Sequence, residues 1–137
     1  SLQPRNDAFE KVILKLKQFA LEALGTKNIT VDFKMDEALS DLRISAVHRK
    51  DLFLIYKEAI NNILKHAQCR KVEIEIKGTR NSFVMRIKDD GIGFRKSLQG
   101  SGNGLHSMQE RVKSLQGELQ IISEPGSGTE VWLKFEI

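Results

Sequence analysis

Three short polar or glycine-rich segments lie far apart in this chain, and they form one site only if the fold brings them together. They cover residues 58–66, 89–94 and 100–105. Glu58 and Asn62 in the first segment are four residues apart, so a helix places both side chains on one face. The second is a carboxylate at a glycine turn, and the third is a glycine-rich loop before a helical pattern, where phosphates bind. Their order and spacing together indicate a nucleotide site.

The composition is that of one globular domain without internal cross-links. The chain has 137 residues, 40% of them hydrophobic and 29% charged, and a domain typically has roughly 150 residues. Cys69 is the single cysteine, which excludes an internal disulfide and fits a reducing cytoplasm. No run approaches the ~18 consecutive apolar residues of a membrane span. We therefore expect a cytoplasmic protein that meets a membrane, if at all, through segments outside this sequence.

The charge pattern argues against a nucleic-acid partner. The net charge of +4 comes from 22 basic and 18 acidic residues, which are interspersed without a long basic run. Such mixing is typical of a solvated surface. The chain begins with Ser1 rather than methionine, so we expect it to be a fragment of a longer protein.

Hydrophobic spacing predicts three helices and five strands. Apolar residues recur at helical spacing over residues 7–24, 45–69 and 105–115. They alternate with polar residues, as in strands, over residues 29–33, 72–76, 83–87, 118–123 and 129–137. The predicted fold class is α/β (α+β): a two-layer sandwich with a mixed, largely antiparallel sheet covered on one face by helices.

The first segment carries the residues for metal binding and proton transfer. Asn62 can offer its amide oxygen to Mg²⁺, which binds oxygen ligands and nucleotide phosphates. Glu58, one helical turn earlier, can accept a proton from an attacking nucleophile. Lys65 and His66 are placed to contact phosphate charge. The alternative is a solvated helix face on which such residues pair with one another, and His66 equally fits an ordinary surface histidine.

The second segment is suited to a nucleotide base. Gly91 and Gly93 allow backbone conformations that are closed to other residues. Ile92 and Phe94 alternate with these glycines, which fits a pocket wall against which a flat base lies. Asp89 can then accept a hydrogen bond from an exocyclic amine. A plain Asp-Gly turn is the alternative.

The third segment contains Gly100, Gly102, Asn103, Gly104 and Leu105. It is not a Walker A motif, because no Gly-Lys-Ser/Thr follows, and it lacks the third glycine of a dinucleotide fingerprint. Its backbone amides and the positive end of the following helix can still hold phosphates. We expect residues 95–104 to be mobile without nucleotide and better ordered with it. A flexible linker is the alternative.

Two more residues complete the candidate site. Thr129 follows the glycine-rich turn at 125–128 and can reach the base pocket, although a simple hairpin explains that turn as well. Asp90, the neighbour of Asp89, is expected to face solvent and to matter little for base recognition.

Taken in order, these segments resemble the GHKL ATPases, the superfamily of gyrase, histidine kinases and MutL. The Glu-x-x-x-Asn of residues 58–62 resembles the N box, and the Asp-x-Gly-x-Gly of residues 89–93 resembles the G1 box. The Gly-x-Gly-Leu of residues 102–105 resembles the G2 box. Residues 58–67 and 104–112 are similar to the short catalytic domains of sensor kinases of the nitrate-sensor and desaturase-sensor type.

The resemblance implies the Bergerat (GHKL ATPase) fold and binding of Mg-ATP. In such kinases the γ-phosphoryl group passes to a histidine on a separate phosphoacceptor domain, and then to a response regulator. The resemblance makes Glu58 the catalytic base, Asn62 the Mg²⁺ ligand and Asp89 the residue that reads the adenine amine. Residues 100–105 would form the ATP lid.

The same resemblance divides the chain into two parts. Residues 1–26 would be an amphipathic connector helix at the end of the dimerisation region, and residues 27–137 the ATP-binding catalytic domain. None of His48, His66 and His106 precedes Asp or Glu, as a phosphoacceptor histidine would. We therefore expect the acceptor histidine and the dimerising helices to lie outside this sequence.

The main alternative is an anti-sigma-factor-type GHKL serine kinase, whose N box also reads Glu-x-x-x-Asn-x-x-x-His. Its partner would be a small antagonist protein phosphorylated on serine. The Met-x-Glu-Arg-Val sequence of residues 108–112 and the predicted N-terminal helix favour the sensor kinase. A non-catalytic dimerisation module is disfavoured because Glu58, Asn62 and Asp89 are intact.

Overall fold

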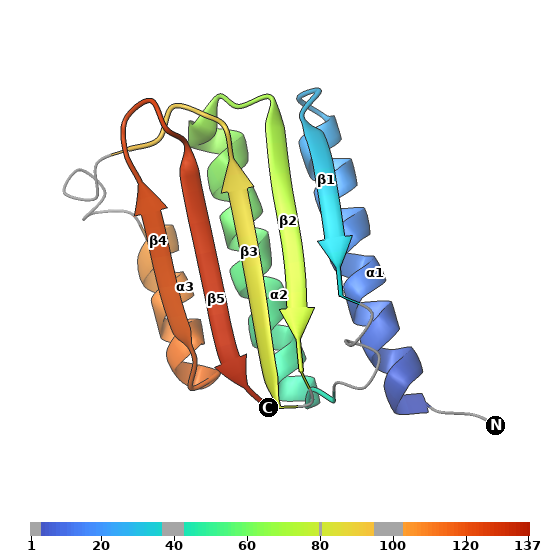
Figure 1. Cartoon of the computed structure of the whole chain (residues 1–137). Helices are drawn as coiled ribbons and strands as arrows, with labels where there is room; N and C mark the ends of the chain where they lie inside the picture. Colours follow the sequence, from blue (N-terminus) through green and yellow to red (C-terminus); the bar gives the residue numbers. More distant parts are fainter. Residues whose placement is uncertain (1–3, 37–42, 80, 95–102) are drawn as a thin grey trace.

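A computed structural model describes residues 4–36, 43–79, 81–94 and 103–137. In this part of the chain, three α-helices lie on one face of a five-stranded sheet, so the architecture has two layers (Figure 1). The predicted fold class is confirmed. None of the helices in these ranges is long and apolar enough to cross a membrane.

The sheet is mixed but mostly antiparallel, with the strand order β1-β2-β3-β5-β4. Its strands are β1 (Thr30–Met35), β2 (Lys71–Gly78), β3 (Ser82–Asp89), β4 (Glu118–Ser123) and β5 (Thr129–Glu136). β1 runs parallel to β2, and the other neighbours are antiparallel. Asp89, the last residue of β3, lies opposite Thr129, the first residue of β5. Two of the predicted site residues therefore meet at one end of the sheet.

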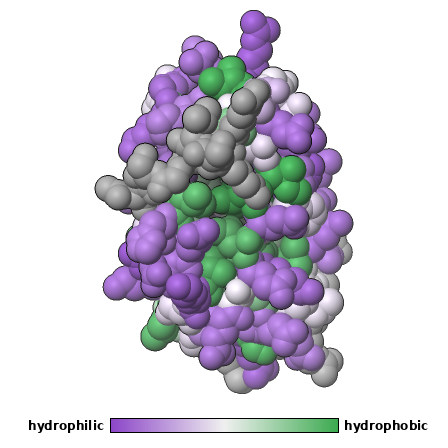
Figure 2. Space-filling view, turned by 90° about the vertical axis from the view of Figure 1, so that its left-hand side faces the viewer, coloured by the Kyte–Doolittle hydropathy of each residue, from purple (hydrophilic) through white to green (hydrophobic). Residues whose placement is uncertain are grey.

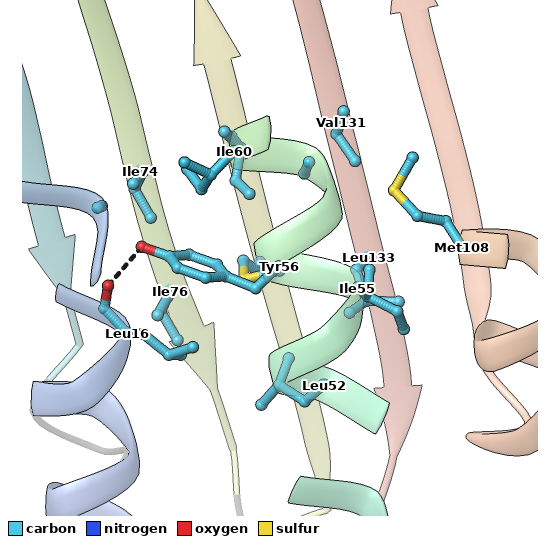
Figure 3. Close-up of a cluster of buried hydrophobic side chains, with 14 of the residues drawn as sticks. Leu16, Leu52, Ile55, Tyr56, Ile60, Ile74, Ile76, Met108, Val131 and Leu133 are labelled. Atoms are coloured by element: carbon cyan, nitrogen blue, oxygen red, sulfur yellow. Dashed lines mark hydrogen bonds between the residues drawn. The ribbon is translucent and has the colours of Figure 1, made fainter. Parts of the chain in front are cut away.

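The core lies between the sheet and the helices. Alternate residues of β2 and β3 point toward the helices because successive side chains of a strand face opposite sides. Figure 3 shows Tyr56 of α2 (Ala46–Asn62) pointing toward the neighbouring helix α1, with Met108 of α3 (Asn103–Ser114) on the other side of α2. Leu52, Ile55 and Ile60 of α2 have no exposed surface.

α1 (Pro4–Gly25) shares this core with the rest of the chain. One of its faces is buried at every third or fourth residue, and the buried set is Phe9, Ile13, Leu16, Ala20 and Leu24. The hydroxyl of Tyr56 on α2 donates to the backbone oxygen of Leu16 at 2.7 Å (Figure 3). The described part of the expected connector helix thus packs on the sheet, and the boundary at residue 26 stays a prediction.

The second predicted helix differs from the expectation near its end. The α-helix begins after Ser45, whose hydroxyl accepts the N–H of His48 at 3.2 Å, and it ends at Asn62. Residues Ile63–Ala67 then form a π-helical turn, labelled η2. Gln68 ends this turn in the left-handed conformation. Single π turns within helices are frequent at functional sites.

An ion pair joins α2 to α3 at the end away from η2. Arg111 Nη1 lies 3.6 Å from Asp51 Oδ1, and the Asp51 side chain is only 11% exposed. The other carboxylate oxygen of Asp51 is buried and has no hydrogen-bond partner among the described residues. An unpaired buried carboxylate destabilises a folded protein. The ion pair with Arg111 therefore offsets part of the cost of burying Asp51.

Candidate functional site

A pocket opens between the end of α2, the start of α3 and one end of the sheet. It contains about 570 Å³ of empty space, a volume that includes the solvent in its open mouth. Figure 2 looks onto this side of the molecule and shows an apolar hollow framed by hydrophilic side chains. Its polar lining residues are Asn62, His66, Asp89 and Thr129.

The remaining lining is apolar apart from one glycine. It consists of Ala59, Ile63, Ala67, Ile87, Gly93, Phe94, Leu105, Met108, Ile121 and Val131. Such a surface suits a flat, largely apolar group with a polar edge, and the four polar residues can fix the orientation of that group.

Seven of the predicted site residues line this pocket together. They come from all three segments and from the last turn: Asn62, His66, Asp89, Gly93, Phe94, Leu105 and Thr129. The fold therefore brings described residues of all three segments to one place, the third being represented by Leu105. Residues 95–102, with Gly100 and Gly102, lie outside the described residues. Asn103 and Gly104 form the start of α3.

Four predicted residues lie near the pocket without lining it. Lys65 and Ile92 are exposed, and Glu58 is half-buried on α2, one turn before Asn62. Gly91 is buried against the end of η2. Glu58 thus lies beside the pocket, within one helical turn of a lining residue.

Asp89 is the buried charge of the site. Asp89 is only 2% exposed. Its Oδ1 accepts the N–H of Gly91 at 2.9 Å. Burial raises the pKa of this carboxyl above its usual value, while the backbone N–H groups of Gly91 and Thr129 act in the opposite direction. The hydrogen bond from Gly91 orients this buried carboxylate, so its remaining acceptor capacity can serve a ligand.

The glycines of the second segment and the last turn are required by close packing. A Cβ on Gly91 would lie 2.0 Å from the backbone oxygen of Ala67, which accepts the N–H of Ile92 at 2.8 Å. Gly93 has φ +65°, and a Cβ there would lie 2.0 Å from the backbone oxygen of Glu124. The turn after Asp89 is thus held between η2 on one side and the β4–β5 turn on the other.

We expect Gly91→Ala to lower the free energy of unfolding by about 1–3 kcal/mol, because the new methyl group would overlap a backbone carbonyl that cannot move freely. Nucleotide binding should fall as well, since the displaced turn carries Asp89. Gly25→Ala is the matched control, because a Cβ there meets nothing within 4 Å. Thermal unfolding and nucleotide titration of both variants test this, and an unchanged melting temperature for Gly91→Ala would contradict it.

The sequence reasoning missed two local features. The π turn η2 was not foreseen, although it presents the Ala67 backbone oxygen to Ile92 and the Leu64 backbone oxygen to Lys27 Nζ at 2.5 Å. Ser123, at the end of β4, was also missed. Its hydroxyl accepts the N–H of Phe94 at 2.9 Å and lies 2.7 Å from the Thr129 hydroxyl. A serine at a strand end has no distinctive sequence signal, which explains this omission.

Asp90 is exposed, as predicted, but its side chain also makes structural hydrogen bonds. Its Oδ1 accepts the backbone N–H of Arg70 at 2.8 Å and that of Lys71 at 3.0 Å. These two donors, Lys71 first, hold the pKa of the Asp90 carboxyl below its usual value. The carboxylate therefore fastens the start of β2 to the end of β3.

A lowered pKa in the folded state means that ionised Asp90 contributes stability above its unfolded pKa, and that this stability is lost as pH falls through the folded pKa. We expect Asp90→Ala to lower the free energy of unfolding by about 1 kcal/mol near neutral pH, because solvent competes for both hydrogen bonds. Thermal unfolding as a function of pH tests this. The difference from the unmodified chain should shrink in acid, and a constant difference would contradict the assignment.

The comparison with known families identifies the domain. The profile of the family described as histidine kinase-, DNA gyrase B-, and HSP90-like ATPase matches residues 47–137. Sensor histidine kinase LiaS of Bacillus subtilis is 34% identical over 138 residues, covering 92% of this chain and 38% of LiaS. Sensor protein VraS of Staphylococcus aureus is 31% identical over 118 residues, covering 80% of this chain and 34% of VraS. The chain thus spans well under half the length of these relatives.

Solved structures agree on the fold. The catalytic domain of histidine kinase ThkA has a TM-score of 0.73 at 16% identity, covering 93% of this chain and 92% of that chain. Acinetobacter baumannii histidine kinase AdeS has a TM-score of 0.72 at 16% identity, covering 93% of this chain and 64% of that chain. The finer likeness to nitrate-sensor and desaturase-sensor kinases stays a prediction. This chain belongs to the histidine kinase-, DNA gyrase B- and HSP90-like ATPase family.

Proposed function

We propose that this chain is the ATP-binding catalytic domain of a sensor histidine kinase. The observation that carries the proposal is the buried Asp89 carboxylate in a largely apolar pocket that Asn62 and His66 also line. The adenine amine can donate to Asp89 while the base lies on the apolar lining. The phosphates then extend toward Asn62, His66 and the start of α3. LiaS and VraS are named as sensor kinases, which supports this choice over the serine-kinase alternative.

Asn62 is the residue that we expect to hold Mg²⁺. It lines the pocket, and its amide oxygen is a hard, neutral ligand of the kind that Mg²⁺ accepts. Mg²⁺ bound with a nucleotide needs only one or two protein ligands, because phosphate oxygens and water supply the others. A single lining carboxamide therefore fits a metal that arrives with the nucleotide, and it would place the charge of the metal beside the phosphates.

We infer that Glu58 acts as the base in the transfer step. A nitrogen of the acceptor imidazole attacks the γ-phosphorus, a nitrogen–phosphorus bond forms, and the bond to the bridging oxygen of ADP breaks. Glu58 takes the proton that the imidazole loses. Its half-buried place one turn before Asn62 puts it at the rim, where an incoming partner can reach it. We infer that Asn62 and Glu58 divide metal binding and proton transfer between them.

The proposal implies partners beyond this chain. The acceptor histidine would lie on a phosphoacceptor domain of the longer protein, which would dimerise through its own helices. A response regulator would receive the phosphoryl group next. We propose that these steps occur in the cytoplasm, where ATP is supplied, and that any link to a membrane runs through other segments.

The direct test is phosphoryl transfer to a separate acceptor. The chain is mixed with a phosphoacceptor-domain fragment and ATP labelled at the γ position. We expect acid-labile label on the acceptor, no label on an acceptor whose histidine is replaced by glutamine, and none on the chain alone. Stable label on His66 or His106 of this chain, or acid-stable phosphoserine on a partner, would overturn the assignment.

A further inference from the structure

The hydroxyl of Ser123 has a complete set of hydrogen-bond partners. The backbone N–H of Phe94 donates to Ser123 Oγ at 2.9 Å. Ser123 Oγ in turn donates to the backbone oxygen of Gly128 at 3.1 Å. The Thr129 hydroxyl lies 2.7 Å from the same Oγ. A serine hydroxyl has one hydrogen and two lone pairs, so these three contacts can use all of its capacity.

The three contacts fix the direction of the Ser123–Thr129 hydrogen bond. A carbonyl oxygen cannot donate, so the only hydrogen of Ser123 is used on Gly128. The Phe94 N–H must point at a Ser123 lone pair. All these groups are satisfied together only if Thr129 donates its hydrogen to the second lone pair. The Thr129 hydroxyl then has no hydrogen left, and it offers only lone pairs to the pocket that Thr129 lines.

We propose that Ser123 is a specificity-determining residue that acts through Thr129. By taking the hydroxyl hydrogen of Thr129, it makes Thr129 an acceptor beside the Asp89 carboxylate, its partner across the β3–β5 ladder. Two acceptors at one end of the pocket match an exocyclic amine, which carries two hydrogens, or a water that the amine orients. They oppose a purine with a carbonyl oxygen at that position. This inference rests on the proposed function only for its nucleotide site.

The base preference of the pocket is the readout that separates this role from a structural one. We compare binding of Mg-ATP with that of the inosine nucleotide, which has a carbonyl oxygen in place of the amine. Removing the serine hydroxyl in Ser123→Ala frees the hydrogen of Thr129 to donate to that carbonyl. The preference for ATP should therefore fall about three- to tenfold, the range of one ordinary hydrogen bond. Ser127→Ala, an exposed serine of the same turn, is the control and should change nothing.

A double-variant cycle shows whether Ser123 acts through Thr129. Thr129→Val removes the hydroxyl while keeping the shape, so adding Ser123→Ala to it should leave the preference unchanged. Ser123→Thr keeps a hydroxyl and should keep the preference. Thermal unfolding without nucleotide accompanies each variant, and Ser123→Cys, with its weakly bonding thiol, replaces the alanine variant if the latter does not fold.

Three outcomes would overturn the proposal. One is an unchanged preference in Ser123→Ala, and another is an equal loss of affinity for both nucleotides, which would mean that Ser123 only supports the turn. The third is the same fall in preference with and without the Thr129 hydroxyl. If the unmodified chain binds no purine nucleotide at all, that result rejects the proposed function, and the inference about Ser123 is rejected with it.

Discussion

Replacing Glu58 with glutamine is expected to slow phosphoryl transfer by about 10²–10⁴-fold, the usual value of general-base assistance. Glutamine has nearly the same shape but cannot take a proton at neutral pH. Because Glu58 lies outside the lining residues of the pocket, ATP affinity should stay within about twofold, since binding and proton transfer are separate contributions. Single-turnover transfer to a separate acceptor domain measures the first quantity, and nucleotide titration measures the second.

Asn62→Ala should show the opposite pattern. Losing the amide oxygen removes the expected protein ligand of Mg²⁺, so Mg-dependent affinity for ATP should weaken, while binding without metal changes little. The matched control for Glu58→Gln is Glu110→Gln, which removes a carboxylate from an exposed part of α3. If Glu58→Gln and Asn62→Ala weaken binding equally and transfer at the same residual rate, the two roles are wrongly divided.

The strands and helices were predictable from the local spacing of apolar and polar residues in the sequence. In β2 and β3, Val72, Ile74, Met85 and Ile87 alternate with charged or polar residues, and the sheet buries each of them. A period of two can bury one face only as a strand, so the tertiary structure agrees with the local preference. The parallel pairing of β1 with β2 depends on where α1 and α2 pack, which no local pattern reveals.

The candidate site was predictable where its residues are chemically unusual and hidden where they are ordinary. Asp89 is a carboxylate that directly follows an alternating strand pattern and precedes two glycines, and the pocket contains it. Met108, Ile121 and Val131 form pocket walls, but in sequence they read as three more core residues. Nothing in the sequence indicated a structural role for Asp90, because its two hydrogen bonds come from backbone N–H groups that are distant in the chain. Long-range backbone contacts of this kind leave no trace in residue type.

The raised pKa of Asp89 predicts a conflict between stability and base recognition. A folded-state pKa above the unfolded value means that the contribution of this group to stability is fully present only below the unfolded pKa, and that it is lost as pH rises through the folded pKa. The ionised carboxylate therefore destabilises the nucleotide-free fold near neutral pH. Asp89→Asn keeps an acceptor oxygen for the Gly91 N–H, so its stability relative to the unmodified chain should rise with pH.

The same carboxylate should decide which base is bound. Because Asp89 accepts hydrogen bonds and cannot donate, it favours the amine of adenine, whereas guanine places a carbonyl oxygen at that edge. A hydrogen bond to a charged group contributes about 1.5–3 kcal/mol, so ATP should be preferred over GTP by at least about tenfold. Asp89→Ala should remove most of this preference while weakening ATP binding. Titration of both nucleotides into both proteins measures this, and an unchanged preference would place base recognition elsewhere. Asp90→Ala is the informative control, since it should lower stability and leave the ratio of ATP to GTP affinity intact.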